Sequence, residues 1–109
     1  MVEKAPRKQF VVHLIGTRPN WPDEMTQEEE KVMGEHFVYL KELTAKKICL
    51  MAGPCMGLRV GLIVLETESK EQAAKIMEKD ASVVAGVHTF EVYDFHLALW
   101  AADYTPPGK

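Results

Sequence analysis

The chain has 109 residues, of which 47% are hydrophobic and 27% are charged, a length and composition typical of one globular domain with its own core. Its formal net charge of -3, with both signs mixed along the chain, gives no electrostatic reason to expect binding to nucleic acid or to an anionic membrane. Because no apolar run could span a bilayer and no signal-peptide pattern follows the N-terminus, we expect a cytoplasmic protein.

Residues 1–8 are polar, and we expect them to be loose. The first predicted strand covers residues 9–15, which carry apolar side chains on both faces, and it ends at Gly16. Residues 17–23 contain two prolines, which predict a loop without regular structure.

The first predicted helix covers residues 27–46, and Thr26-Gln27-Glu28-Glu29 supplies a capping-box pattern at its start. Apolar residues recur inside it at the three- and four-residue spacing of one helix face. They are Met33, Phe37, Leu40 and Leu43. His36 falls inside this stripe. Its imidazole is therefore predicted to face the core, where a polar group needs a hydrogen-bond partner.

Two short predicted strands follow, residues 48–52 and 59–66, separated by a turn. A second capping-box pattern opens a predicted helix over residues 70–79. Its apolar stripe consists of Ala73, Ile76 and Met77. Asp80 continues this stripe by one step. We therefore predict that Asp80 projects into the same interior as His36 and is its hydrogen-bond partner.

Residues 83–86 form a short link that is compatible with one helical turn, and residues 88–99 form a last long predicted strand. Residues 101–109 contain two prolines and a glycine and are interpreted as a tail. Residues 1–109 thus form a single domain with its core at about residues 9–99. The order β-α-β-β-α-β is the split βαβ arrangement of the ferredoxin-like α+β fold.

The first three predicted strands are apolar on both faces, although two helices can cover only one face of a four-stranded sheet. A wide uncovered apolar face predicts a partner, most simply a second copy of the same sheet. We therefore predict a homodimer packed sheet against sheet, and a higher oligomer is compatible with the same pattern.

Several metal, thiol and cofactor sites are disfavoured by residue spacing. Cys49 and Cys55 lie six residues apart without a second pair, which is neither a zinc pattern nor a disulfide framework. His13, His88 and His96 fall on predicted strands and lack the close spacing of known metal motifs. No glycine-rich phosphate-binding loop follows a strand. We therefore expect reduced thiols, no metal and no cofactor.

A series of short motifs runs along the chain. They are Arg18-Pro19, Trp21-Pro22, Met25-Thr26 with Glu28-Glu29, Glu35-His36-Phe37-Val38-Tyr39-Leu40, Ala52-Gly53-Pro54, Asp80, Ala85-Gly86-Val87 and the last strand through Phe95. In this order they resemble the YCII-related (YciI-like) family of small dimeric α+β barrels, over roughly residues 9–99. The sequence departs from the family pattern at Ala81, where members usually have proline, and at Lys46, where they usually have glycine.

The resemblance implies an active site formed by a histidine on the first helix and an aspartate after the second, which correspond to His36 and Asp80. The structural alternative is a buried ion pair that merely satisfies two polar groups. In a catalytic pair, His36 would move a proton and Asp80 would orient its imidazole. Arg18 is a candidate for holding a ligand anion, or else an exposed loop arginine. Trp21 is a candidate lid over a ligand ring, or else a loop anchor.

These residues favour a cofactor-independent enzyme that performs acid–base chemistry on a small oxygenated compound, aromatic or not. The reaction would be an elimination such as dehydrochlorination, as in one member of the family, or an isomerisation beside a carbonyl. Two alternatives share the fold, namely a non-enzymatic small-molecule-binding or regulatory module and a cofactor-free monooxygenase. The enzyme hypothesis requires His36 to reach a cavity, whereas the binding hypothesis does not.

Overall fold

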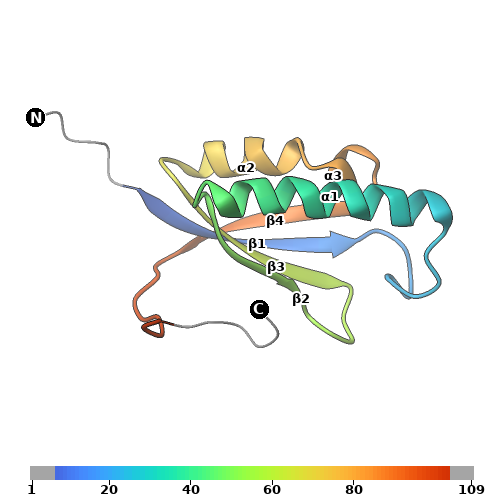
Figure 1. Cartoon of the computed structure of the whole chain (residues 1–109), viewed down its shortest axis with the longest axis horizontal. Coiled ribbons are helices and arrows are strands. Elements are labelled where there is room, and N and C mark those ends of the chain that lie inside the picture. The colour runs from blue at the N-terminus through green and yellow to red at the C-terminus, as the bar shows by residue number, and fades with distance from the viewer. Residues whose placement is uncertain (1–6, 104–109) are drawn as a thin grey trace, which may run out of the picture.

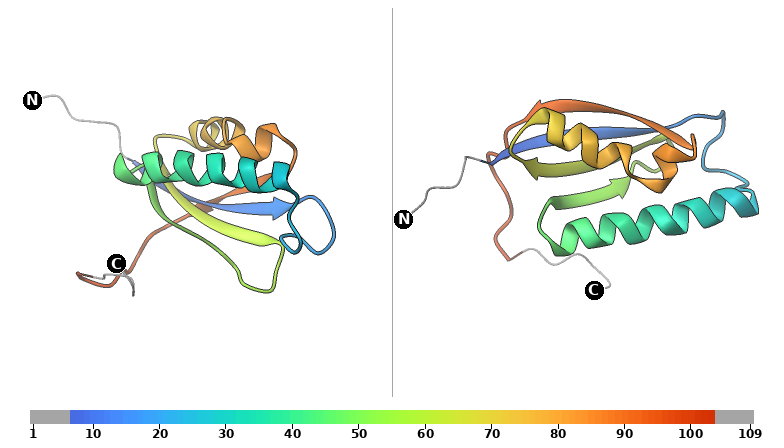
Figure 2. Two further views of the ribbon diagram at one scale, coloured as in Figure 1. Left: turned by 45° about the vertical axis from the view of Figure 1, so that its right-hand side comes forward. Right: turned by 90° about the horizontal axis from the view of Figure 1, so that it is seen from above.

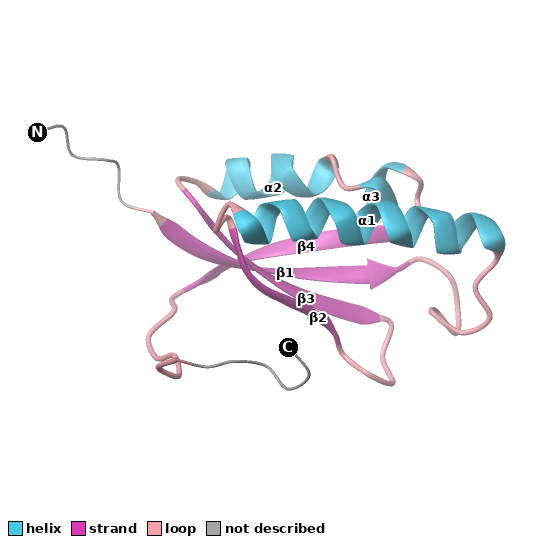
Figure 3. Cartoon of the chain, in the orientation of Figure 1, coloured by secondary structure: helices cyan, strands magenta, loops and turns pink. Residues whose placement is uncertain are grey.

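The computed structural model describes residues 7–103, so the predicted loose terminus, residues 1–8, and the predicted tail, residues 101–109, lie largely outside the described residues. The elements are β1 (Lys8–Gly16), α1 (Gln27–Ala45), β2 (Cys49–Pro54), β3 (Val60–Thr67), α2 (Lys70–Glu78), α3 (Ala81–Val84) and β4 (His88–Phe95). The four strands form one antiparallel sheet in the order β2-β3-β1-β4 (Figures 1 and 3). This arrangement confirms the predicted α+β, ferredoxin-like fold.

The helices lie on one face of the sheet and leave the other face open (Figures 1 and 2). β1 is central, because it pairs with β3 on one side and with β4 on the other. Every second residue of β1 faces the helices and is buried, as the two-residue repeat of a strand requires. The buried core between the two layers consists of Phe10, Val12, Leu14, Leu40, Leu43, Cys49, Ile63, Leu65, Ala73 and Met77.

The open face carries the alternate residues of the same strands. Val11 of β1 is partly buried and lies opposite Val64 of β3 and Tyr93 of β4. Met51 on β2 is 61% exposed. The segment after β4 passes to this side of the sheet (Figure 1), and its Trp100 is 74% exposed. The sheet thus has a face without covering helices, on which these apolar side chains lie beside polar ones such as His13 and Glu91.

The buried face of α1 differs from the predicted one. The buried residues are Val32, His36, Leu40 and Leu43. Phe37, predicted to be part of the stripe, is instead 63% exposed, with the Lys41 ammonium 5.9 Å from its ring centroid. Met33 is only partly buried. Both stripes have helical spacing, and the packing of α1 against its neighbours selects the one that begins at Val32.

Two further boundaries depend on neighbouring elements. β4 ends at Phe95 rather than at residue 99, because its pairing with β1 ends at Gln9, opposite Phe95. The link after α2 contains the short helix α3, and Asp80 is the N-cap of α3 rather than a residue of the α2 stripe. The carboxylate therefore reaches the interior from a helix cap.

Two findings concern the length of the helices and the state of the two cysteines. None of the helices in residues 7–103 combines the length and the apolar character needed to cross a bilayer. Cys49 and Cys55 form no disulfide in the described chain; Cys49 is buried in the core and Cys55 is partly exposed.

Candidate functional site

The first turn of α1 is held by the predicted capping box. The Thr26 hydroxyl accepts a hydrogen bond from the backbone N–H of Glu29 at 3.1 Å, and the Glu29 carboxylate accepts one from the N–H of Thr26 at 3.0 Å. These bonds satisfy two donors that a helix start leaves free. From this start the helical repeat places His36 on the buried side of α1, where it is 9% exposed.

Asp80 is fully buried and has hydrogen-bond donors on both carboxylate oxygens. Its Oδ1 accepts from the backbone N–H of Ser82 at 2.8 Å and from the Ser82 hydroxyl at 2.9 Å. Its Oδ2 lies 2.7 Å from Nδ1 of His36. The predicted contact between the two side chains is therefore present. Because an ionised carboxylate only accepts hydrogen bonds, Nδ1 of His36 is the donor, and a neutral His36 keeps its lone pair on Nε2.

The environment of Asp80 keeps it ionised. Burial is the strongest single influence and would by itself raise the pKa of Asp80. The hydrogen bonds from His36 and Ser82 act in the opposite direction and together outweigh burial, so the pKa of Asp80 lies below its ordinary value. At neutral pH the interior therefore holds a fixed negative charge against the imidazole of His36.

Tyr39 fastens α1 to α2 near this pair. Its hydroxyl donates a hydrogen bond to the carbonyl oxygen of Ile76 at 2.7 Å. Burial, followed by the negative charges of Asp80 and Glu42, raises the pKa of Tyr39. Tyr39 thus stays neutral near pH 7, and its hydroxyl links α1 to α2 through this hydrogen bond.

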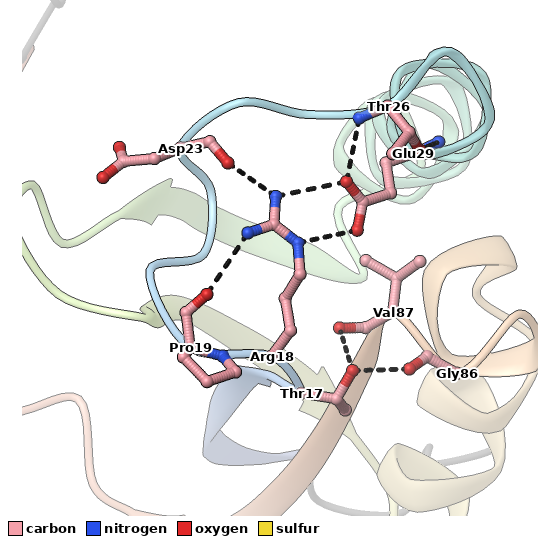
Figure 4. Close-up of polar contacts among 8 residues, drawn as sticks. All are labelled: Thr17, Arg18, Pro19, Asp23, Thr26, Glu29, Gly86 and Val87. Atoms are coloured by element: carbon pink, nitrogen blue, oxygen red, sulfur yellow. Dashed lines mark hydrogen bonds and ion pairs between the residues drawn. The ribbon is translucent and has the colours of Figure 1, made fainter.

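Arg18, a predicted ligand-binding residue, is engaged with the chain itself (Figure 4). Its Nε and Nη2 bind the Glu29 carboxylate at 2.9 and 3.1 Å, and its other hydrogen bonds are with the carbonyl oxygens of Pro19 and Asp23. The hydrogen bonds with Glu29 raise the pKa of Arg18, and the same bonds lower the pKa of Glu29. A role for Arg18 in holding a ligand anion stays a prediction, and such an anion would compete with Glu29 for the same donors.

The loop between β1 and α1 is also fastened at its other end. The Thr17 hydroxyl donates to the carbonyl oxygen of Gly86 at 2.7 Å (Figure 4), and the Thr17 N–H donates to that of Val87 at 3.0 Å. These bonds bring the loop beside the turn that precedes β4.

Trp21 is 7% exposed and lies inside this loop. A Cβ atom at Gly16 would collide with the Trp21 ring, so the ring packs directly on the backbone at the end of β1. The Arg18 guanidinium lies over the indole, 5.3 Å from the ring centroid. The indole also meets the ring of His88 edge-on at 5.2 Å. Trp21 therefore joins the interior that contains the His36–Asp80 pair, and its predicted role as a lid stays a prediction.

His88 completes this cluster, although sequence reasoning considered it only as a metal ligand. It is 5% exposed, and its ring centroid lies 5.8 Å from that of His36. Burial, and then the nearby His36, lowers the pKa of His88 from 6.5 to about 4. Among the described residues its Nδ1 has no hydrogen-bond partner, a state that costs about 1–3 kcal/mol for a buried polar atom.

Two sequence signals could have revealed the inward position of His88 and the place of Asp80 at a helix cap. His88 has the same strand parity as Phe90 and Val92, which pack against the core, so it was predictable as a polar residue on the inner face. Asp80-Ala81-Ser82 is a local pattern in which an aspartate caps a helix through the residue two positions later.

Two surface hollows lie away from this cluster. One, of about 1110 Å³, is lined by residues near the start of β1 and the end of β4, including Phe10, Phe95 and Trp100. The other, of about 430 Å³, lies beside Lys46 and Ile76. Neither hollow is lined by His36, Asp80 or His88. These two hollows therefore do not open onto the cluster.

Comparison with known proteins agrees with the motifs. Among solved structures, the chain is similar to 5-chloro-2-hydroxyhydroquinone dehydrochlorinase from Burkholderia phenoliruptrix AC1100, in complex with 2,5-dihydroxybenzoquinone. The TM-score is 0.64 at 20% sequence identity, and the match covers 81% of this chain and 93% of that chain. At this identity the likeness shows a shared fold. No curated protein sequence matches the chain. Residues 10–96 match the YCII-related domain, and the chain therefore belongs to the YCII-related domain family.

Proposed function

We propose that the protein is a cofactor-independent enzyme that moves protons on a small oxygenated compound, with His36 as the acid–base residue and Asp80 as its partner. The observation that carries the proposal is the buried hydrogen bond of 2.7 Å between Nδ1 of His36 and Oδ2 of Asp80. It holds the imidazole in one tautomer, in which Nε2 is the proton acceptor. The carboxylate then stabilises the imidazolium that forms when Nε2 takes a proton.

The similar structure directs the choice of the first substrate to test. That protein is named for the dehydrochlorination of 5-chloro-2-hydroxyhydroquinone. In such an elimination one hydroxyl proton of the substrate is first moved to the carbon that bears chlorine, which makes that ring carbon tetrahedral. A base then takes a second hydroxyl proton, the ring electrons shift to form the quinone, and the C–Cl bond breaks with its electron pair leaving on chloride. His36 would accept the proton in this step. An isomerisation would use the same pair, because His36 would return the proton to another carbon.

Trp21 and Arg18 have supporting roles in this proposal. Trp21 borders the cluster from the β1–α1 loop, where it would lie over the ring of the ligand. Arg18 holds that loop through Glu29, with hydrogen bonds of 2.9 and 3.1 Å. A ligand anion that reached the guanidinium would exchange with Glu29 and loosen the loop as it bound.

The test is chloride release from 5-chloro-2-hydroxyhydroquinone, measured by ion chromatography without oxygen or added cofactor. The wild type should exceed the protein-free rate, and His36→Gln should abolish this excess. Asp80→Asn should lower kcat by about 100-fold or more, because a neutral amide cannot stabilise an imidazolium. Thr89→Ala, an exposed residue of β4, is the control and should keep wild-type turnover.

The alternatives give different outcomes in the same assay. A binding module would retain the compound without releasing chloride. A monooxygenase would turn it over only when oxygen is admitted. Turnover that survives His36→Gln would contradict the proposed role of His36. For a purely structural pair, the main effect of breaking it would be a loss of stability of about 3–5 kcal/mol.

We also propose that two copies of the chain associate through the open face of the sheet. The proposal is supported by the exposed Met51, Tyr93 and Phe95 on that face, and by Leu99 and Trp100 just after β4, which are 90% and 74% exposed. A partner sheet would remove this apolar surface from water.

A further inference from the structure

We propose that His88 is a ligand-contacting residue, whose Nδ1 forms a hydrogen bond with a second oxygen atom of the compound on which His36 acts. This inference rests on the proposed function, because it places His88 and His36 in the same binding space. It also narrows the substrate to a class, namely small rings that carry at least two uncharged oxygen groups.

The position of His88 follows from the strand register. His88 pairs with Gly16 at the end of β1, the point from which the loop carrying Trp21 departs. The imidazole therefore has the Trp21 indole on one side, at 5.2 Å, and the His36 ring on another, at 5.8 Å. With these ring spacings, one six-membered ring with two oxygen substituents is large enough to contact both imidazoles.

The hydrogen bonding of His88 distinguishes it from a residue that only fills the core. Buried polar side chains nearly always have a hydrogen-bond partner. His88 is buried, with only 5% of its surface exposed, yet its Nδ1 has no such partner among residues 7–103. A phenylalanine would fill the same space without desolvating a nitrogen. An oxygen atom of a bound compound would provide the partner that the described residues do not.

The charge state of His88 sets the kind of oxygen that it recognises. With a pKa of about 4 it is neutral at pH 7, so its ring offers one N–H donor and one acceptor nitrogen. A neutral imidazole beside the negative Asp80 suits a hydroxyl or a carbonyl oxygen. A carboxylate or a phosphate would be repelled by Asp80 and would gain no opposing charge from His88.

The experiment combines ligand titration with nitrogen NMR of the ¹⁵N-histidine-labelled protein at pH 7. The probe is 2-hydroxyhydroquinone, with hydroquinone and catechol as simpler rings, and all three are uncharged at pH 7. The Nδ1 resonance of His88 should shift on binding, and His88→Phe should weaken binding about 10- to 100-fold. His88→Asn, whose amide takes the place of Nδ1, should recover part of that loss. His96→Phe, at an exposed histidine beyond β4, should bind like the wild type.

The stability of the ligand-free protein gives an independent readout. His88→Phe should raise the denaturation midpoint, because it removes a buried nitrogen that has no partner. A lower midpoint would assign His88 a structural role and would overturn the inference.

The outcomes separate this inference from the proposed function. If His88→Phe binds the probe as tightly as the wild type, or if chloride release proceeds in it with an unchanged KM, the inference is wrong while the function of His36 stands. If no chloride is released but the His88 resonance still responds to the rings, the enzymatic proposal fails and the binding role of His88 is supported. Failure of all three rings to bind the wild type would overturn both.

Discussion

Burial acts on the charges of Asp80 and His88 in the same direction, toward the neutral form, but the two residues respond differently. Asp80 has donors on both oxygens and stays ionised, with its pKa below the ordinary value. His88 has no such support at Nδ1, and its pKa falls to about 4. At neutral pH His36 therefore contacts a charged carboxylate and has a neutral imidazole nearby.

The shifted pKa of His88 predicts a pH-dependent stability. The unfolded chain takes up a proton on His88 near pH 6.5, whereas the folded chain does so only near pH 4. The unfolded state thus binds more protons between these values, and the free energy of unfolding should fall as the pH is lowered through this window. From His88 alone the loss should approach about 3 kcal/mol, at about 1.4 kcal/mol per pKa unit.

Urea denaturation of the wild type and of His88→Phe at pH 7, 6, 5 and 4 measures this contribution. The variant should lose less stability across the series. Asp80, which faces the same interior, should contribute equally to the stability of both proteins. Because its pKa is lowered, the stability that its ionised form provides is lost only at more acidic pH. His36 is likewise common to both. Parallel curves for the two proteins would show that His88 does not titrate in this way.

At the scale of elements, the first residues of α1 and α2 could be predicted from the sequence because the hydrogen bonds that cap a helix start are local. Thr26 and Ser69 accept hydrogen bonds from residues three positions later, so the pattern and the structure involve the same few residues. The buried side of α1 could not be predicted in full. Two adjacent stripes have the same spacing, and contacts with distant elements decide that Val32 rather than Phe37 is buried.

In the candidate site too, features that depend on local sequence could be predicted, and features that depend on contacts between distant elements could not. The His36–Asp80 contact could be predicted only in part, because the helical repeat places His36 inward, whereas Asp80 reaches it as the N-cap of α3 and not from the predicted α2 stripe. The surroundings of His88 could not, since they depend on how the β1–α1 loop folds back over the end of the sheet. Trp21 reaches His88 across 67 positions of sequence only because Thr17 and Arg18 fasten that loop. No local pattern encodes such a contact.

The fastening by Arg18 predicts how the loop responds to a change in Glu29. Glu29→Gln keeps a residue type that completes the capping box but loses the charge that binds the guanidinium. In a Trp100→Phe background, where Trp21 is the only tryptophan, acrylamide should quench Trp21 more strongly after Glu29→Gln. Far-UV circular dichroism should stay unchanged. Glu28→Gln in the same turn is the control, and equal quenching in all three proteins would contradict the fastening role.

At the scale of the whole molecule, the sheet separates two surfaces. Residues of β1 that face the helices contribute to the core and to the end of the sheet where the cluster lies. The alternate residues, such as Val11 and Ile15, belong to the open face. A change on one surface can therefore be made with little effect on the other.

The open face yields a prediction about assembly. Light scattering at micromolar concentration should report twice the chain mass of 12.3 kDa. Leu62→Glu, on the open face of β3 opposite His13, should shift the mass toward one chain, because a sheet-to-sheet contact would bury an unpaired charge. Lys31→Glu on the exposed side of α1 should leave the mass unchanged. A wild type that remains a stable monomer would exclude the proposed dimer.

The two fastenings of the β1–α1 loop have a consequence for how this fold can acquire new chemistry. Thr17 is bound to the turn before β4, and Arg18 is bound to the first turn of α1. The side chains of residues 19–25, which lie between Arg18 and the N-cap Thr26, can vary while these bonds hold the two ends of the loop in place. Natural variation or a designed library confined to this short stretch would thus redirect the choice of compound while the proton-transfer pair stays in place.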